Sequence, residues 1–121
     1  PGDHGTTYGG NPLVTAAASA VLSIFEERGI VEHVNLVGGY LWEKLEELAA
    51  QFDCITGHRG RGLMQGLEFQ MPVGPIVQKA LLEEKLVLIS AGSNIIRFVP
   101  PLIIEREHVD EMVRRLTAVL E

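Results

Sequence analysis

The sequence predicts an α/β protein of the α+β kind, in which long helices precede a small sheet of three or four short strands covered by helices. Residues 13–28 and 31–52 have the apolar periodicity of helices. Short apolar segments bounded by glycine and proline follow and are typical of strands. An amphipathic segment over residues 106–120 predicts a last helix. The length of 121 residues suits one modest domain.

The first predicted helix has strong start and stop signals. Asn11 can cap the free backbone N–H groups, and Pro12 fits the first helical position because it lacks a donor. Residues 13–25 are apolar nearly all round, so we expect this helix to be buried on several sides. Gly29 predicts its end.

The second and last helices should each bury one stripe, because apolar residues recur every three or four positions. The stripe of the second helix comprises Val34, Val37, Leu41, Leu45, Leu48 and Phe52. The stripe of the last helix comprises Val109, Met112, Val113, Leu116 and Leu120.

The pattern changes to short strands after Asp53. We expect strands over residues 54–56, 63–70, 86–89 and 95–99, a tight turn over 57–62 and a short helix over 77–82. In the strand over 63–70, the residues on one face are Leu63, Leu67 and Phe69. The predicted organisation is an opening loop over residues 1–12, a helix pair over 13–52 and a small α/β domain over 53–121.

The composition argues against several classes of function. A net charge of −6 disfavours nucleic acid binding, which needs clustered Lys and Arg. No apolar run approaches the roughly 20 residues that span a bilayer. Cys54 is the only cysteine, which suits a cytoplasmic protein, and the four histidines lack metal-ligand spacing, so we expect no metal site. Because the chain begins at Pro1 without Met or a signal sequence, we expect it to start inside a longer gene product.

The opening loop, residues 4–11 (HGTTYGGN), is the first candidate site. Its glycines let backbone N–H groups approach a ligand, and its hydroxyls can donate to anionic oxygens. The loop also precedes a helix N-terminus, which favours anions, so a phosphate is the expected ligand. The alternative interpretation is a polar turn with a threonine cap.

Arg97 is the second candidate, because it interrupts an apolar strand. A guanidinium there needs an anionic partner or a solvent-facing side, and its planar fork suits a carboxylate. Simple alternation, with Arg97 pointing outward, explains the pattern equally well. We predict that Arg59 and Arg61 are surface or interface charges rather than ligands. The three lysines (Lys44, Lys79 and Lys85) lie beside glutamates on predicted helices, and we expect them to be solvated and ion-paired.

Three motifs resemble those of the class III aminotransferases, which use pyridoxal phosphate. Residues 3–12 (DHGTTYGGNP) are similar to the family loop His-Gly-Ser/Thr-Thr-Tyr/Phe-Gly-Gly-Asn-Pro. The resemblance continues through residues 59–68 (RGRGLMQGLE) and 96–102 (IRFVPPL). Within the class, the start of the loop at residues 1–4 and the compact C-terminal lobe are most similar to the acetylornithine aminotransferases.

The resemblance implies the C-terminal part of a fold-type I homodimer that binds pyridoxal 5'-phosphate. It implies that Thr7 hydrogen-bonds the cofactor phosphate in the neighbouring subunit, that Thr6 contacts substrate and that Arg97 binds the substrate α-carboxylate. The Schiff-base lysine lies upstream of Pro1 in relatives, so this chain should hold no catalytic residue and be inactive alone.

The implied reaction of the parent protein moves an amino group between N-acetylornithine and 2-oxoglutarate, in arginine biosynthesis. Two alternatives stay open. One is another class III enzyme, acting on ornithine, succinylornithine or 4-aminobutyrate. The other is a non-catalytic α/β interaction domain that uses the apolar helix over residues 13–25 to bind a partner.

Overall fold

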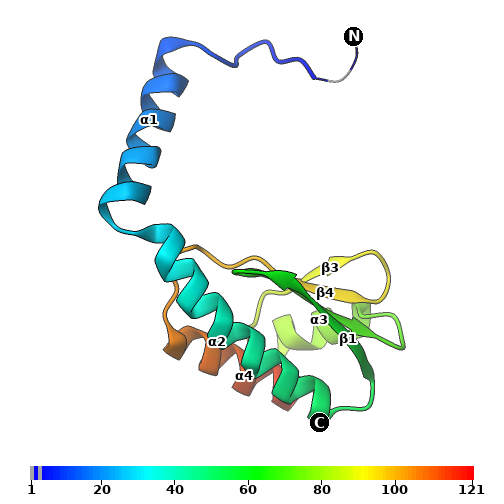
Figure 1. The fold of residues 1–121 in the computed structure, drawn as a ribbon. Helices are drawn as coiled ribbons and strands as arrows, with labels where there is room; N and C mark the ends of the chain where they lie inside the picture. Colours follow the sequence, from blue (N-terminus) through cyan, green and yellow to red (C-terminus); the bar gives the residue numbers. More distant parts are fainter. Residues whose placement is uncertain (1, 3) are drawn as a thin grey trace. The chain divides into compact units, whose positions relative to one another are not determined.

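The computed structural model describes Gly2 and residues 4–121. Pro1 and Asp3, which belong to the predicted opening loop and its first motif, lie outside the described residues. The chain divides into two compact units, Pro1–Val31 and Glu32–Glu121. The predicted α/β class is confirmed (Figure 1), with the elements α1 Pro12–Glu27, α2 Ile30–Gln51, β1 Ile55–Arg61, β2 Met64–Phe69, α3 Gly74–Leu82, β3 Ile89–Ala91, β4 Ile95–Phe98 and α4 Arg106–Leu120.

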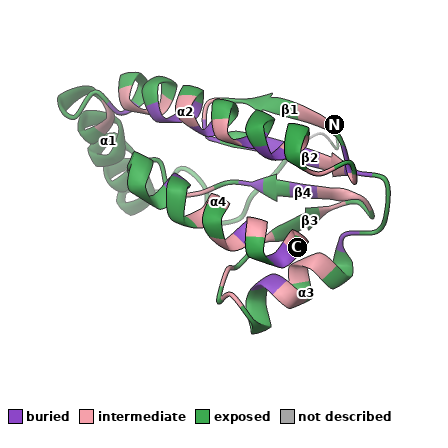
Figure 2. Cartoon of the chain, turned by 90° about the horizontal axis from the view of Figure 1, so that it is seen from below, coloured by how far each residue is buried: buried purple, intermediate pink, exposed green. Residues whose placement is uncertain are grey.

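Helix α1 begins as the sequence predicts. The backbone N–H of Val14 donates to Asn11 Oδ1 at 3.1 Å, and Pro12 occupies the first turn. The predicted burial is wrong for this chain, since α1 contains no buried residue and Leu13 is 79% exposed. The physical reason is that the first unit offers α1 no second layer to pack against. In Figure 2 the helix is almost entirely in the colour of exposed residues.

The sheet has four antiparallel strands in the order β1-β2-β4-β3. Strand β1 is longer than predicted, because residues 57–61 pair with β2 and the turn is confined to residues 62–63. Gly62 makes this turn with a φ of +55°, which favours glycine.

The predicted strand over residues 86–89 is wrong, because the ladder covers Ile89–Ala91 instead. Strand β4 ends at Phe98, before Pro100 and Pro101. Prolines offer no backbone donor, so the residues before Ile89 have no continuing strand to pair with. Val87 is consequently 75% exposed.

One face of the sheet packs on α2 and α4 (Figure 2). The predicted stripes of both helices and the predicted inner face of β2 are confirmed as core residues or as partly buried neighbours of the core. The core comprises Val37, Leu41, Leu45, Leu48, Ile55, Leu63, Leu67, Phe69, Val73, Ile96, Phe98, Val109 and Leu116. Along each strand, the side chains that alternate with the core residues therefore lie on the other face of the sheet.

Helix α2 meets the turn of the β1–β2 hairpin without a side chain between them. A Cβ on Gly38 would lie 2.6 Å from the carbonyl carbon and oxygen of Gly62. Gln65, a buried polar residue of β2, donates from Nε2 to the carbonyl oxygens of Gly38 at 2.8 Å and Gly62 at 2.6 Å. The amide thus ties the helix backbone to the turn.

A histidine extends this polar connection. Gln65 Oε1 lies 3.0 Å from His58 Nε2, and Glu46 Oε1 of α2 lies 2.7 Å from His58 Nδ1. The His58 ring stacks on Trp42, with ring centroids 3.9 Å apart. The β1–β2 hairpin is thereby held to α2 by side chains whose roles the apolar pattern does not predict.

Helix α4 is fastened to α2 by polar contacts. Tyr40 Oη donates to Asp110, and this hydrogen bond raises the pKa of Tyr40.

Within α4, the Glu111 carboxylate accepts hydrogen bonds from the Nε atoms of Arg114 and Arg115, each over a distance of 2.8 Å. These bonds lower the pKa of the Glu111 carboxyl to about 2.

We predict opposite effects from alanine at the two adjacent glycines of α2. Gly38→Ala should lower the free energy of unfolding by about 1–3 kcal/mol, because the new methyl forces the helix away from the turn. Gly39→Ala is the matched control, since a Cβ there meets nothing within 4 Å. It should raise stability by about 0.5–1 kcal/mol, because alanine favours the helix. Urea unfolding measures both, and equal effects of the two substitutions would contradict the close approach.

The Glu111 pairs predict a pH-dependent contribution to stability. With a folded pKa of about 2 against an ordinary 4.5, the contribution is full above pH 4.5 and disappears as the pH falls through 2. Glu111→Gln should therefore lower the urea midpoint near pH 6 by a small amount, since the pairs are solvent-exposed, and should match the unsubstituted chain near pH 2. Glu43→Gln, on the exposed face of α2, is the control and should show no such convergence. A deficit for Glu111→Gln that is the same at every pH would refute the interpretation.

Candidate functional site

Arg97 lies on the open face of the sheet. Its neighbours in β4, Ile96 and Phe98, are buried, while Arg97 is exposed, as alternation requires. In the register it lies opposite Gly66 of β2 and Ile89 of β3. The ion pairs found within residues 4–121 do not include Arg97, so its guanidinium is available to a ligand.

A shallow cavity of about 320 Å³ lies on this open face. Three arginines and several apolar or glycine positions line it, and no acidic residue is among them. The lining residues are Arg59, Gly60, Arg61, Met64, Gln65, Gly66, Ala91, Ile95 and Arg97. Such a cavity favours anions.

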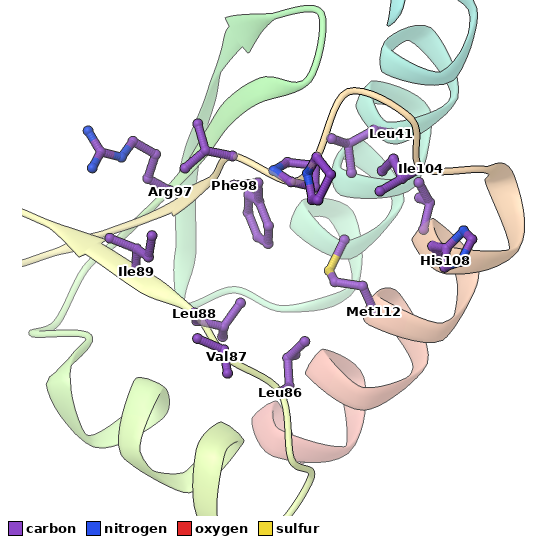
Figure 3. Close-up of a pocket in the computed structure, with 14 residues that line it drawn as sticks. Leu41, Leu86, Val87, Leu88, Ile89, Arg97, Phe98, Ile104, His108 and Met112 are labelled. Atoms are coloured by element: carbon purple, nitrogen blue, oxygen red, sulfur yellow. The ribbon is translucent and has the colours of Figure 1, made fainter. Parts of the chain in front are cut away.

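A second cavity, of about 390 Å³, is apolar and lies between the sheet, the segment before β3 and α4. Arg97 contributes to its rim, but its guanidinium points away from the apolar side chains of Leu88 and Met112 (Figure 3). His108 also lines it, and its Nδ1 accepts from the backbone N–H of Glu105 at 3.0 Å as part of the α4 cap. The His108 imidazole in this cavity thus has a structural role.

The opening loop is a tight turn that leads into α1. Thr6 Oγ1 accepts from the backbone N–H of Gly9 at 3.2 Å, and Asn11 Nδ2 donates to the carbonyl of Tyr8 at 2.7 Å. A Cβ at position 9 would lie 2.3 Å from Thr6 Cγ2, so a larger residue there would force the Thr6 side chain to shift. The alternative interpretation, a polar turn with a threonine cap, agrees with the contact between Thr6 and Gly9, while Asn11 caps the helix itself. The loop belongs to the first unit and Arg97 to the second.

The two threonines differ in their hydrogen bonding. The Thr6 hydroxyl oxygen is engaged within the loop, whereas no hydrogen bond of the Thr7 side chain is found in the described part of the chain, and Thr7 is exposed. The Thr7 hydroxyl is therefore open to solvent.

The three lysines have partners of two kinds. Lys44 pairs with Glu47 at 2.7 Å, as predicted. The prediction of ion pairs is wrong for the other two, because Lys79 donates to the carbonyl of Val119 at 2.7 Å and Lys85 to that of Leu82 at 2.6 Å. Lys85 also lies after α3 rather than on a helix. Cys54 is partly buried and packs against the core.

Among the residues that the structure describes, no group of three or more His, Cys, Asp or Glu side chains is arranged to hold a metal ion. None of the helices in residues 4–121 combines the length and apolar character that a membrane crossing requires.

Comparison with known proteins decides the family. The family model for class III aminotransferases matches residues 1–120. The chain belongs to the class III aminotransferases. It is 46% identical to the acetylornithine aminotransferase of Clostridium acetobutylicum over 112 residues, which cover 92% of this chain and 29% of that protein.

Solved structures of two aminotransferases show the same fold. The acetylornithine aminotransferase of Elizabethkingia anophelis is 32% identical with a TM-score of 0.83, over 99% of this chain and 31% of that one. The lysine aminotransferase of Mycobacterium tuberculosis is 28% identical with a TM-score of 0.86, over 99% of this chain and 28% of that one. The chain thus spans less than a third of the length of these aminotransferases.

Proposed function

We propose that this chain forms the C-terminal part of a pyridoxal phosphate-dependent enzyme that moves an amino group between N-acetylornithine and 2-oxoglutarate, in arginine biosynthesis. The observation that carries the proposal is the family match over residues 1–120, together with 46% identity to an acetylornithine aminotransferase. The position of Arg97 on an anion-favouring open face supports it.

The opening loop fits the phosphate of the cofactor. Its glycines keep the backbone accessible, Thr7 presents an exposed hydroxyl, and Asn11 at the start of α1 aligns the helix N-terminus behind it. Thr7 would hold the phosphate in the neighbouring subunit of a homodimer. When bound, pyridoxal phosphate serves as the electron sink for carbanion chemistry, while the protein orients the reactants.

Arg97 has the role of binding the α-carboxylate of the amino donor. Its stem lies along apolar residues and its fork is free, so a bidentate carboxylate contact is sterically open. The role of Thr6 is to contact substrate beside the cofactor. Because its oxygen already accepts from Gly9, Thr6 would act as a hydroxyl donor toward the substrate.

The chain by itself should hold no catalytic residue. Lys44 is hydrogen-bonded to Glu47, and Lys79 and Lys85 each donate to a backbone carbonyl. We propose that the lysine that joins the cofactor lies in a large domain outside this sequence. In that organisation residues 1–12 form the cofactor loop, 13–52 an inter-domain helix pair and 53–121 the small domain of a cytoplasmic enzyme.

The proposed function predicts that the gene encodes a large domain before Pro1 and that its product transaminates N-acetylornithine with 2-oxoglutarate. The 121-residue chain alone should give no turnover under the same conditions with pyridoxal phosphate added. Coupled detection of glutamate measures both. An open reading frame that begins with Met immediately before Pro1 would favour the non-catalytic interaction domain, and faster turnover of free ornithine than of N-acetylornithine would favour another class III enzyme.

The role of Arg97 predicts a loss of donor binding. Arg97→Ala in the longer enzyme should raise KM for N-acetylornithine by the equivalent of about 2–5 kcal/mol, as for other charge-assisted pairs that lose one partner. Arg28→Ala removes an exposed charge outside the site and serves as the control. Initial rates over a range of donor concentrations give both constants. An unchanged KM for the Arg97 variant would refute the carboxylate role.

A further inference from the structure

His58 is a buried titratable side chain with a polar partner at each ring nitrogen. It lies on β1, and its side chain is 2% exposed. Its Nδ1 is 2.7 Å from Glu46 Oε1 of α2, and its Nε2 is 3.0 Å from Gln65 Oε1 of β2. A neutral imidazole has one N–H donor and one acceptor, whereas the charged ring has two donors. The two partners therefore decide which protonation state of His58 the site accommodates.

The orientation of the Gln65 amide follows from two backbone carbonyls. Its nitrogen lies 2.8 Å from the oxygen of Gly38 and 2.6 Å from the oxygen of Gly62, and these oxygens only accept hydrogen bonds. Exchanging the nitrogen and oxygen of the amide would place an acceptor against both carbonyls. The amide oxygen therefore faces His58, and the Nε2 atom of the ring must carry a proton to donate to it.

The other ring nitrogen faces a carboxylate. Glu46 accepts a hydrogen bond from Nδ1 only when Nδ1 also carries a proton, so only the charged ring makes both bonds at once. Trp42 stacks on the ring, and the face of an indole favours a cation. A ring that loses one proton keeps its bond to the buried Gln65 and gives up its bond to Glu46, whose side chain is 53% exposed and can turn to water.

The charged side chains of the hairpin point away from His58. On its own strand, Arg59 and Arg61 alternate with it and line the cavity on the open face of the sheet. On β2, Glu68 lies between the buried Leu67 and Phe69 and therefore also turns to the open face.

On α2, the nearby lysine has other contacts. Lys44 pairs with Glu47 at 2.7 Å, and its Nζ lies 5.7 Å from the centre of the Tyr40 ring. Glu46 is therefore the charged group of the helix that faces the His58 ring.

We propose that His58 is a protonation-dependent latch between α2 and the β1–β2 hairpin. With both ring nitrogens protonated it binds Glu46 and Gln65 together, and with Nδ1 deprotonated it releases Glu46. Because the closed latch needs the extra proton, its contribution to stability is present while the ring is charged and is lost as the pH rises through the range in which imidazole titrates. The latch goes beyond the proposed function and does not depend on it, since no cofactor or substrate takes part.

The test follows the urea unfolding midpoint of the 121-residue chain between about pH 5.5 and 8.5, where carboxylates stay ionised. Glu46→Gln is the informative variant, because the new amide accepts from a protonated Nδ1 and donates to a deprotonated one. Over this range the midpoint of the unsubstituted chain should fall by about 0.3–0.5 M relative to that of Glu46→Gln, since one partly exposed charge-assisted bond is lost. The comparison cancels the other histidines, which both chains contain.

Glu43→Gln is the matched control. It removes the same charge from an exposed position of α2, one turn before Glu46, and should keep the pH dependence of the unsubstituted chain. A second readout is the ¹⁵N NMR spectrum of the His58 ring. At about pH 8.5 the remaining proton should be on Nε2, because that nitrogen donates to Gln65.

Three results would overturn the latch. The first is a pH dependence of the midpoint that Glu46→Gln leaves unchanged. The second is an equal effect of Glu43→Gln, which indicates a general influence of charge on α2. The third is a neutral ring with its proton on Nδ1, which means that the bond to Glu46 outlasts the bond to Gln65. Amide spectra with unchanged dispersion establish that each variant is folded.

Discussion

Helix α2 and the β1–β2 turn approach each other at Gly38 and Gly62 so closely that no side chain fits between them. The Gln65 amide then donates to both backbone carbonyls, which a bulkier contact would hold out of reach. This contact fixes which face of the hairpin lies on the helix, because successive side chains of a strand point to opposite faces. With Gln65 and Leu67 turned inward, Gly66 must face outward. The register then places Arg59 and Arg97 on the open face beside it.

The sequence predicted the elements whose stability comes from apolar burial. The stripes of α2 and α4, the inner residues of β2 and the place of Arg97 in a strand all follow from periodicity, and the structure confirms them. Strand pairing was harder to predict, because it depends on partners distant in the sequence. Residues 57–61 read as a glycine turn in isolation, yet their pairing with β2 makes them a strand. The network of Gln65, His58 and Glu46 was missed for a related reason, since polar residues show a structural role only once their partners are known.

For helix α1, the apolar pattern predicts burial that this chain does not provide. Its capping by Asn11 and Pro12 is local and appears as predicted. Its burial depends on surfaces beyond its own unit, and none of its residues is buried here. An apolar helix needs a packed face for most of its stability. The same distinction applies to the site, because the geometry of Thr6 and Thr7 follows from the loop itself, whereas the partner of Thr7 does not.

The distribution of charge explains why the net charge of the chain does not predict which ions the open face of the sheet attracts. The chain carries a net charge of −6, but the acidic residues of α2 and α4 lie on helices that cover the opposite side of the sheet from Arg59 and Arg97. Charges farther apart than about 8 Å are largely screened at physiological ionic strength. An anion at the open face therefore responds mainly to the nearby guanidinium groups. Exposed arginines bind weakly one at a time, since each contact orders a long side chain. The spacing of the arginines on this face is set by the register of β1, β2 and β4.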